Sequence, residues 1–289
     1  MKPPPFEYHA PRDLDEALRI LAGVRGKVLA GGQSLIPMLN MRLAAPAHLV
    51  DITRVASLDA LERTREGVRV GAAVTHARAE REGGHPLLTR ALRLVAHPVI
   101  RNRGTVVGSL VHADPAAELP AVLAVLGGSV RLARWDGARG QVRDVPAHEF
   151  FVGPMESAAG PDELAVSAFF PALDERTGHA FHEVARRHGD YALAGVCAVV
   201  TLGEDGGVAA ARVACVGVGP APVVADLTGA GAGDWALAAA ALSRRVEPED
   251  DIHATAAYRR HLVAVLAERA LKEAAGLAER ASKEAAGGA

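Results

Sequence analysis

The segment KVLAGGQSLIP, residues 27–37, joins a short apolar run to two adjacent glycines, two hydrogen-bonding side chains and a second apolar run. The first run predicts a β-strand that ends at Gly31 and Gly32. Two interpretations of the glycines are open at this point. They form a plain turn, or they shape a backbone whose N–H groups bind a phosphate group.

A second segment has the same character. RNRGTVVGSLVHADPAAELP, residues 101–120, places glycine and small hydroxyl residues between an extended stretch and a predicted helix. Thr105 and Ser109 can add hydroxyl donors to exposed backbone N–H groups. Two such loops from distant parts of one domain could hold the two phosphates of a dinucleotide, although a structural turn explains either loop taken singly.

Length and composition narrow the function classes. The chain has 289 residues, enough for two domains, with 49% hydrophobic residues and a formal charge of −2. This balance gives no basic footprint for nucleic acid and no polybasic membrane patch. The N-terminal MKPPPFEYHAP lacks the apolar core of a signal peptide, and no apolar run approaches the roughly 20 residues of a membrane span. We expect a cytoplasmic chain without membrane insertion.

Motifs for several kinds of chemistry are missing from the sequence. It contains no G-x-G-x-x-G, no P-loop, no G-x-S-x-G and no H-E-x-x-H. The two cysteines, Cys197 and Cys215, lie in apolar runs without a CxxC pattern, so we expect two buried thiols and no iron–sulfur cluster. The sequence therefore predicts no catalytic acid, base or nucleophile and no metal site.

Helical and strand patterns alternate along the chain. Asp13 is the predicted N-cap of a helix that ends near Gly23, and Pro37 argues against a regular helix after the first glycine segment. A hairpin is predicted around the turn WDGARG, and a strand at DELAVSAFFP. Beyond Ala172 three strands are followed by Ala-rich helices. The pattern is α+β with two domains, and the tail after about residue 275 is expected to fray.

Several longer blocks of sequence allow a more specific interpretation of the two glycine segments. The chain contains, in order, KVLAGGQSLIPMLNMRL, LVDITR, HPVIRNRGTVVGSLVHADPAAELPAVL, FHEVARRHGDYALAGVCAV and DDIHATAAYRRHL. Together they resemble the medium, FAD-binding subunit of the molybdenum hydroxylases, the carbon monoxide dehydrogenase and xanthine dehydrogenase family. The resemblance extends from Lys2 to about Leu271.

This resemblance implies a fold. The expected fold is an α+β, two-lobed FAD-binding domain (PCMH-type) over residues 1–175, with the lobes divided near residues 55–60. A smaller C-terminal domain of a three-stranded antiparallel sheet plus helices is expected over residues 176–289.

The resemblance also implies cofactor-binding residues. The first pyrophosphate-binding loop matches Ala30–Ser34, and the second matches Thr105–Ser109. Glu118 matches a position that reaches the ribose or adenosine side of the cofactor, Asp114 lies close to the same surface, and Tyr191 matches an aromatic position near the flavin ring. The full set of expected cofactor-binding residues is Ala30, Gly31, Gly32, Gln33, Ser34, Thr105, Val107, Gly108, Ser109, Asp114, Glu118 and Tyr191.

The second loop departs from the family pattern. Val107 stands where a first glycine is usual, and Ser109 replaces an asparagine. If the position requires a positive φ, Val107 is strained by about 1–3 kcal/mol. If it requires only a close approach, the valine side chain crowds the phosphate. Either effect would weaken FAD binding.

The function implied by the resemblance is electron transfer. The chain would bind FAD without a covalent link, receive electrons from [2Fe–2S] clusters on a small subunit and deliver them to an external acceptor. Molybdopterin would be held by a separate large subunit. Two other hypotheses remain open: a flavin-free assembly module of the same complex, favoured by Val107, and a self-standing flavin oxidase, which would turn over substrate as an isolated chain.

Overall fold

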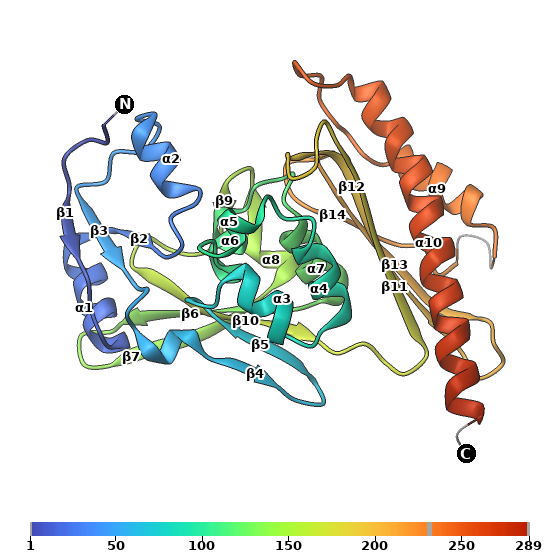
Figure 1. Cartoon of the computed structure of the whole chain (residues 1–289), viewed down its shortest axis with the longest axis horizontal. Coiled ribbons are helices and arrows are strands. Elements are labelled where there is room, and N and C mark those ends of the chain that lie inside the picture. The colour runs from blue at the N-terminus through green and yellow to red at the C-terminus, as the bar shows by residue number, and fades with distance from the viewer. Residues whose placement is uncertain (1, 230–232, 288–289) are drawn as a thin grey trace. The chain divides into compact units, whose positions relative to one another are not determined.

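The computed structural model describes residues 2–229 and 233–287 (Figure 1). The chain forms two compact units, and each unit is assembled from several stretches of sequence. Unit 1 contains Met1–Gly84, His97–Ala113 and Gly128–Phe170, and the remaining residues form unit 2. The predicted domain boundary near residue 175 and the division near residues 55–60 stay predictions.

Unit 1 begins with a small parallel sheet in the strand order β1-β3-β2. Its strands and the helices between them are β1 (Glu7–His9), α1 (Leu14–Val24), β2 (Lys27–Leu29), α2 (Leu35–Asn40) and β3 (His48–Asp51). The predicted N-cap is confirmed, because the Asp13 carboxylate accepts a 2.8 Å hydrogen bond from the backbone N–H of Glu16. Ala17, Leu18 and Leu21 form the buried face of α1.

The expectation that Pro37 prevents a regular helix is wrong. Pro37 is the third residue of α2. N–H groups in the first turn of a helix have no intrahelical acceptor, so proline loses no hydrogen bond there.

A five-stranded sheet in the order β4-β5-β10-β6-β7 forms the rest of the unit 1 framework. Its strands are β4 (Leu61–Arg63), β5 (Gly67–Gly71), β6 (Ser129–Trp135), β7 (Gly140–Pro146) and β10 (Glu163–Pro171). The predicted hairpin is confirmed by the antiparallel pairing of β6 with β7, and the strand predicted at DELAVSAFFP is β10.

Short elements fill the connections of unit 1. They are η1 (Ala56–Asp59), α3 (His76–Glu82), α5 (Pro98–Arg101), α6 (Val106–His112), α8 (Ala147–Phe150), β8 (Phe151–Gly153) and β9 (Glu156–Ser157). The second glycine segment was expected to be a loop, and this expectation is wrong over α5 and α6. Each of these helices is only one or two turns long, too short for a clear apolar period.

Unit 2 is built on an antiparallel sheet in the order β11-β12-β13-β14. Its elements are α4 (Pro86–Leu92), α7 (Glu118–Leu126), β11 (Thr177–Ala185), β12 (Ala192–Leu202), β13 (Val208–Val216), β14 (Val223–Asp226), α9 (Trp235–Ser243) and α10 (Ala256–Gly287). Three strands were expected and four are present. The fourth, β14, has four residues and follows the Gly- and Pro-containing segment GVGPAP, which does not resemble a strand.

Helices cover both faces of this sheet. Figure 1 shows α9 and α10 on one face of the unit 2 sheet and α4 and α7 on the other. On the α10 side, Ala194, Val196, Ala198 and Val200 alternate along β12 and join the apolar core. Helix α10 comes very close to β11, since a methyl group on Gly178 would lie 1.9 Å from the carbonyl oxygen of Ala274.

Helix α10 continues through residues 275–287, where a frayed tail was expected; residues 288–289 lie outside the described residues. Cys197 and Cys215 are free and fully buried, as predicted. Within residues 2–229 and 233–287, no helix is both long enough and apolar enough to cross a bilayer.

Candidate cofactor site

The first glycine segment runs from the end of β2 into α2 with a backbone that only glycine permits. A methyl group on Gly31 would lie 2.1 Å from the carbonyl oxygen of Arg103 and 2.7 Å from the Cα of Gly104. Gly32 has a φ of +74°, in the left-handed region. The Gln33 side-chain amide donates to the carbonyl oxygen of Gly31 at 3.2 Å, which fixes the turn further.

The backbone N–H groups of this segment indicate a ligand-binding site. Among the described residues, no acceptor is present for the N–H groups of Gly31, Gly32, Gln33 and Ser34. Consecutive N–H groups without a protein partner form a concavity suited to an anion. Gly31, Gly32 and Gln33 also border a pocket of about 420 Å³, within the range of small-molecule sites. The pocket is lined by Leu29, Ala30, Gly31, Gly32, Gln33, Ile36, Pro37, Asn40, Asp51 and Arg103.

The second glycine segment forms a helix start. Thr105 is the N-cap of α6, and its hydroxyl accepts a 3.1 Å hydrogen bond from the backbone N–H of Gly108. A methyl group on Gly108 would lie 2.6 Å from that hydroxyl oxygen. Ser109, one residue on, pairs its hydroxyl with the Nε2 of His76 at 2.9 Å. Both hydroxyls that were predicted to contact phosphate therefore already have a partner within unit 1.

Val107 is not strained, so the first of the two alternatives for this position does not hold. It lies in the first turn of α6 and is absent from the described residues with positive φ. Its side chain is 2% exposed and belongs to the core. The valine therefore neither forces an unusual backbone nor presents its side chain to a ligand at the surface. The flavin-free alternative loses the observation that favoured it.

His76 is a part of this site that the sequence did not reveal. Its backbone N–H donates to the carbonyl oxygen of Gly104 at 2.8 Å, and Thr75 pairs with Thr105 in a β-bridge. The ring is 3% exposed, and this burial lowers its pKa to about 4, so the imidazole is neutral near pH 7. Because it is held from two sides, His76 fixes the start of α6 and the Ser109 hydroxyl. A lone histidine after Val-Thr carries no motif that could have identified it.

The other expected cofactor residues, Asp114, Glu118 and Tyr191, belong to unit 2. Asp114 is buried and accepts a 2.9 Å hydrogen bond from the N–H of Ala116. Glu118 starts α7, and burial together with the negative charge of Asp114 raises its pKa to about 7. Tyr191 is 68% exposed.

Glu183 on β11 extends this acidic group, and the sequence gave no indication of it. Burial and the charge of Glu118 raise its pKa to about 8. Its Oε2 is buried without a hydrogen-bond partner among the described residues. Glu118 and Glu183 therefore change protonation state near neutral pH. When protonated, each carboxyl group can donate a hydrogen bond. Their environment depends on residues far apart in sequence.

Comparison with known proteins shows the family of the chain. Residues 4–173 match the family described as "FAD binding domain in molybdopterin dehydrogenase". The chain belongs to this family. Residues 179–274 match the "CO dehydrogenase flavoprotein C-terminal domain". The chain therefore carries the FAD-binding domain of the medium subunits of molybdenum hydroxylase-type dehydrogenases.

Individual relatives share this architecture over nearly their whole length. The 6-hydroxypseudooxynicotine dehydrogenase complex subunit alpha of Paenarthrobacter nicotinovorans is 38% identical, over 95% of this chain and 96% of its own. The carbon monoxide dehydrogenase medium chain of Hydrogenophaga pseudoflava is 34% identical, over 95% and 98%. The crystal structure of quinoline 2-oxidoreductase from Pseudomonas putida 86 matches with a TM-score of 0.88 and 34% identity, over 96% and 99%. The predicted family and fold are confirmed, and the chain is an oxidoreductase subunit.

Proposed function

We propose that the chain is the FAD-binding electron-transfer subunit of a molybdenum-dependent dehydrogenase complex. It receives electrons from the [2Fe–2S] clusters of a small subunit and delivers them to an external acceptor. Substrate is oxidised on a separate large subunit that holds molybdopterin. Bound flavin would supply the exchange between one-electron and two-electron chemistry.

The observation that carries this proposal is the row of N–H groups from Gly31 to Ser34, which have no acceptor in residues 2–229 and 233–287, beside the pocket of about 420 Å³. These backbone N–H groups would bind the pyrophosphate of FAD. Because Gly31 has no side chain, the backbone of Arg103 and Gly104 can pack against this segment. Thr105 follows directly in the sequence. The two glycine segments of the sequence are therefore neighbours in unit 1.

The remaining expected residues have separate roles in the proposal. Thr105 and Gly108 shape the start of α6, and Ser109 offers a hydroxyl oriented by His76. Val107 contributes backbone only, since its side chain is buried. Asp114 and Glu118 are assigned to the adenosine side of the cofactor and Tyr191 to the flavin ring, on the resemblance of the sequence.

The proposal assigns the other redox groups to partner chains. Two buried cysteines cannot supply the four thiolates that a [2Fe–2S] cluster needs. Relatives of this chain are named as medium chains or as subunits of dehydrogenase complexes. We include a cytoplasmic location in the proposal, in accord with two thiols that remain free.

The visible spectrum of the purified chain tests the cofactor. The chain is incubated with excess FAD and desalted, and its flavin absorption is compared with its protein concentration. We expect close to one FAD per chain to survive desalting. A folded chain that stays colourless after this treatment would overturn the proposal.

The electron path needs a second experiment. The chain is purified together with the large and small subunits of the proposed complex, and flavin reduction is followed after substrate is added. The proposal requires reduction in the full complex and none with the medium subunit alone. Reduction by the isolated chain would instead favour a self-standing flavin oxidase.

A further inference from the structure

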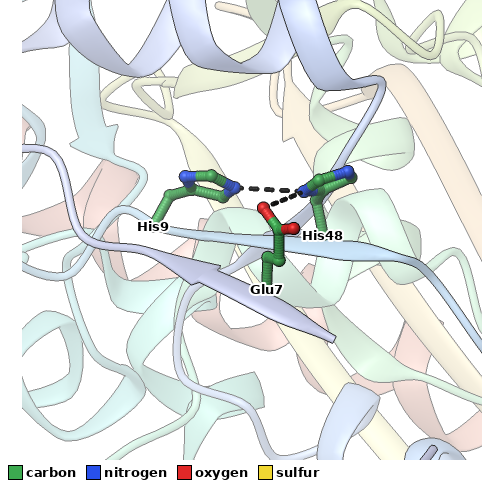
Figure 2. Close-up of side chains that lie close together, drawn as sticks. All are labelled: Glu7, His9 and His48. Carbon is green, nitrogen blue, oxygen red and sulfur yellow. Dashed lines mark hydrogen bonds and ion pairs between the residues drawn. The ribbon is translucent and has the colours of Figure 1, made fainter. Parts of the chain in front are cut away.

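Three metal-ligating side chains converge on one face of the small parallel sheet. Glu7 and His9 come from β1 and His48 comes from β3, as Figure 2 shows. In the register of these strands, Glu7 lies opposite His48. Since strand side chains alternate, Glu7, His9 and His48 share a face, while Tyr8 points to the other face and donates to Asp51.

The donor atoms of this cluster lie close together. The Nε2 of His9 is 3.2 Å from the Nδ1 of His48, and that Nδ1 is 3.4 Å from the Oε2 of Glu7. All three donor atoms lie within 4.8 Å of one another. In a tetrahedral zinc site with bonds of about 2.0–2.1 Å, ligand atoms are separated by about 3.3 Å. Two of the three separations already fit such a site.

The remaining separation can adjust without backbone movement. The Glu7 side chain is 74% exposed, so its carboxylate is free to rotate toward His9. The His48 side chain is 24% exposed and is held by the pairing of β3 with both neighbouring strands. The cluster thus combines a fixed imidazole with an adjustable carboxylate and leaves a coordination position open to water.

A plain surface contact is the competing explanation. The two rings can share one proton in a hydrogen bond, and Glu7 can pair with a protonated His48. In that arrangement the two imidazoles and the carboxylate share a single proton. A divalent cation would engage all three donors at once and displace that proton.

We infer that Glu7, His9 and His48 bind a divalent transition-metal ion of the zinc class, with water completing its coordination. Two imidazoles and one carboxylate form a known zinc ligand set, whereas Ca²⁺ and Mg²⁺ prefer sites made of oxygen ligands. The ion fastens β1, a three-residue strand at the edge of its sheet, to β3. None of these three residues is among those assigned to FAD binding.

Calorimetric titration with Zn²⁺ tests the site. The full chain, without a histidine tag, is loaded with FAD, freed of metal with a chelator and dialysed. We expect saturable binding of one Zn²⁺ per chain. His9→Gln and His48→Gln should each weaken binding by about tenfold or more, because each removes one of only three protein ligands. Glu7→Gln should weaken binding as well, and its exposed position poses no risk to folding.

His148→Gln is the matched control. His148 lies 3.3 Å from a Glu149 carboxylate oxygen, and both side chains are exposed. It has the same histidine–carboxylate contact but belongs to no cluster of three metal-ligating groups among the described residues. Zinc affinity should be unchanged in this variant.

A Cu²⁺ spectrum provides a readout that a purely structural role would not alter. Electron paramagnetic resonance of the Cu²⁺-loaded chain should show coupling to two imidazole nitrogens, reduced to one in His48→Gln. Circular dichroism checks that each variant is folded. Absence of saturable zinc binding, or an equal loss of affinity in His148→Gln and His48→Gln, would overturn the inference.

Discussion

Gly31 and Arg103 are in backbone contact, and a methyl group on Gly31 would lie 2.1 Å from the Arg103 carbonyl oxygen. No side chain fits there without moving one of the two backbones. The contact joins the backbone N–H groups after β2 to the segment that leads into α6. At this contact, the backbone geometry of the first glycine segment therefore depends on the position of the second glycine segment.

Gly31→Ala should abolish stable FAD binding. The added methyl group must push the Arg103 backbone away, at a cost of about 1–3 kcal/mol in the free energy of unfolding. Flavin retained after desalting and the thermal midpoint measure the two effects. Gly23→Ala is the control, because a methyl group there has no neighbour within 4 Å. Since Gly23 is an exposed residue inside α1, that variant should gain about 0.5–1 kcal/mol and keep its flavin.

Val107→Gly should weaken the protein without improving cofactor binding. The substitution empties a buried position and places glycine in α6, which together cost about 2–4 kcal/mol. Urea unfolding and an FAD titration measure the outcome. Tighter FAD binding in this variant would contradict the conclusion that Val107 contributes backbone only. Val107→Ile, which keeps the side chain apolar, is the comparison variant. It should change FAD affinity less than Val107→Gly does.

Gly178→Ala should destabilise unit 2. The new methyl group would lie 1.9 Å from the carbonyl oxygen of Ala274, so that α10 must move away from β11. We expect a loss of about 2–3 kcal/mol. Gly276→Ala in the same helix has no such conflict, since the nearest atom, on the Arg280 side chain, is 3.9 Å away, and should be stabilising. Similar thermal midpoints for the two variants would argue against the close packing of α10.

Glu183→Gln should make stability less dependent on pH. The pKa of Glu183 is raised from 4.5 to about 8 in the folded chain. Between these values the folded state holds a proton that the unfolded state has released, so stability falls as the pH rises from about 4.5 to about 8. Glutamine has no such proton. The variant should therefore exceed the wild type by about 1–3 kcal/mol at pH 9 and equal it at pH 4.

Thermal unfolding across this pH range measures the difference. Glu204→Gln is a suitable control, because the Glu204 side chain is 93% exposed. A gain at pH 9 in the control as large as that in Glu183→Gln would show that the effect follows net charge alone. An unchanged pH dependence in Glu183→Gln would contradict the raised pKa.

Local rules predicted those features of the fold that neighbouring residues determine. Asp13 caps α1, and the hairpin of β6 and β7 forms around its turn, because both depend on contacts within a few residues. The two adjacent glycines after β2 marked a backbone with special requirements, and the structure gives Gly31 a steric reason and Gly32 a positive φ. Their partner at Arg103 could not be read from periodicity.

Features that depend on burial were not predictable. His76 and Glu183 owe their altered pKa values to surroundings contributed by distant segments. The suspected strain at Val107 assumed a loop, whereas the segment continues as helix from the Thr105 cap. Strand β14 was missed because its four residues become a strand only by pairing with β13.

Unit 2 is assembled from segments that are far apart in the sequence, and this affects how the chain folds during synthesis. Helices α4 and α7 leave the ribosome before β11, β12 and β13, against which they pack. Every residue from Leu119 to Val125 in α7 is buried in the complete fold. Until translation passes β13, the nascent chain carries this apolar helix without the sheet that covers it, as a binding site for chaperones. Translation that stops early should thus leave an aggregation-prone product rather than a usable half.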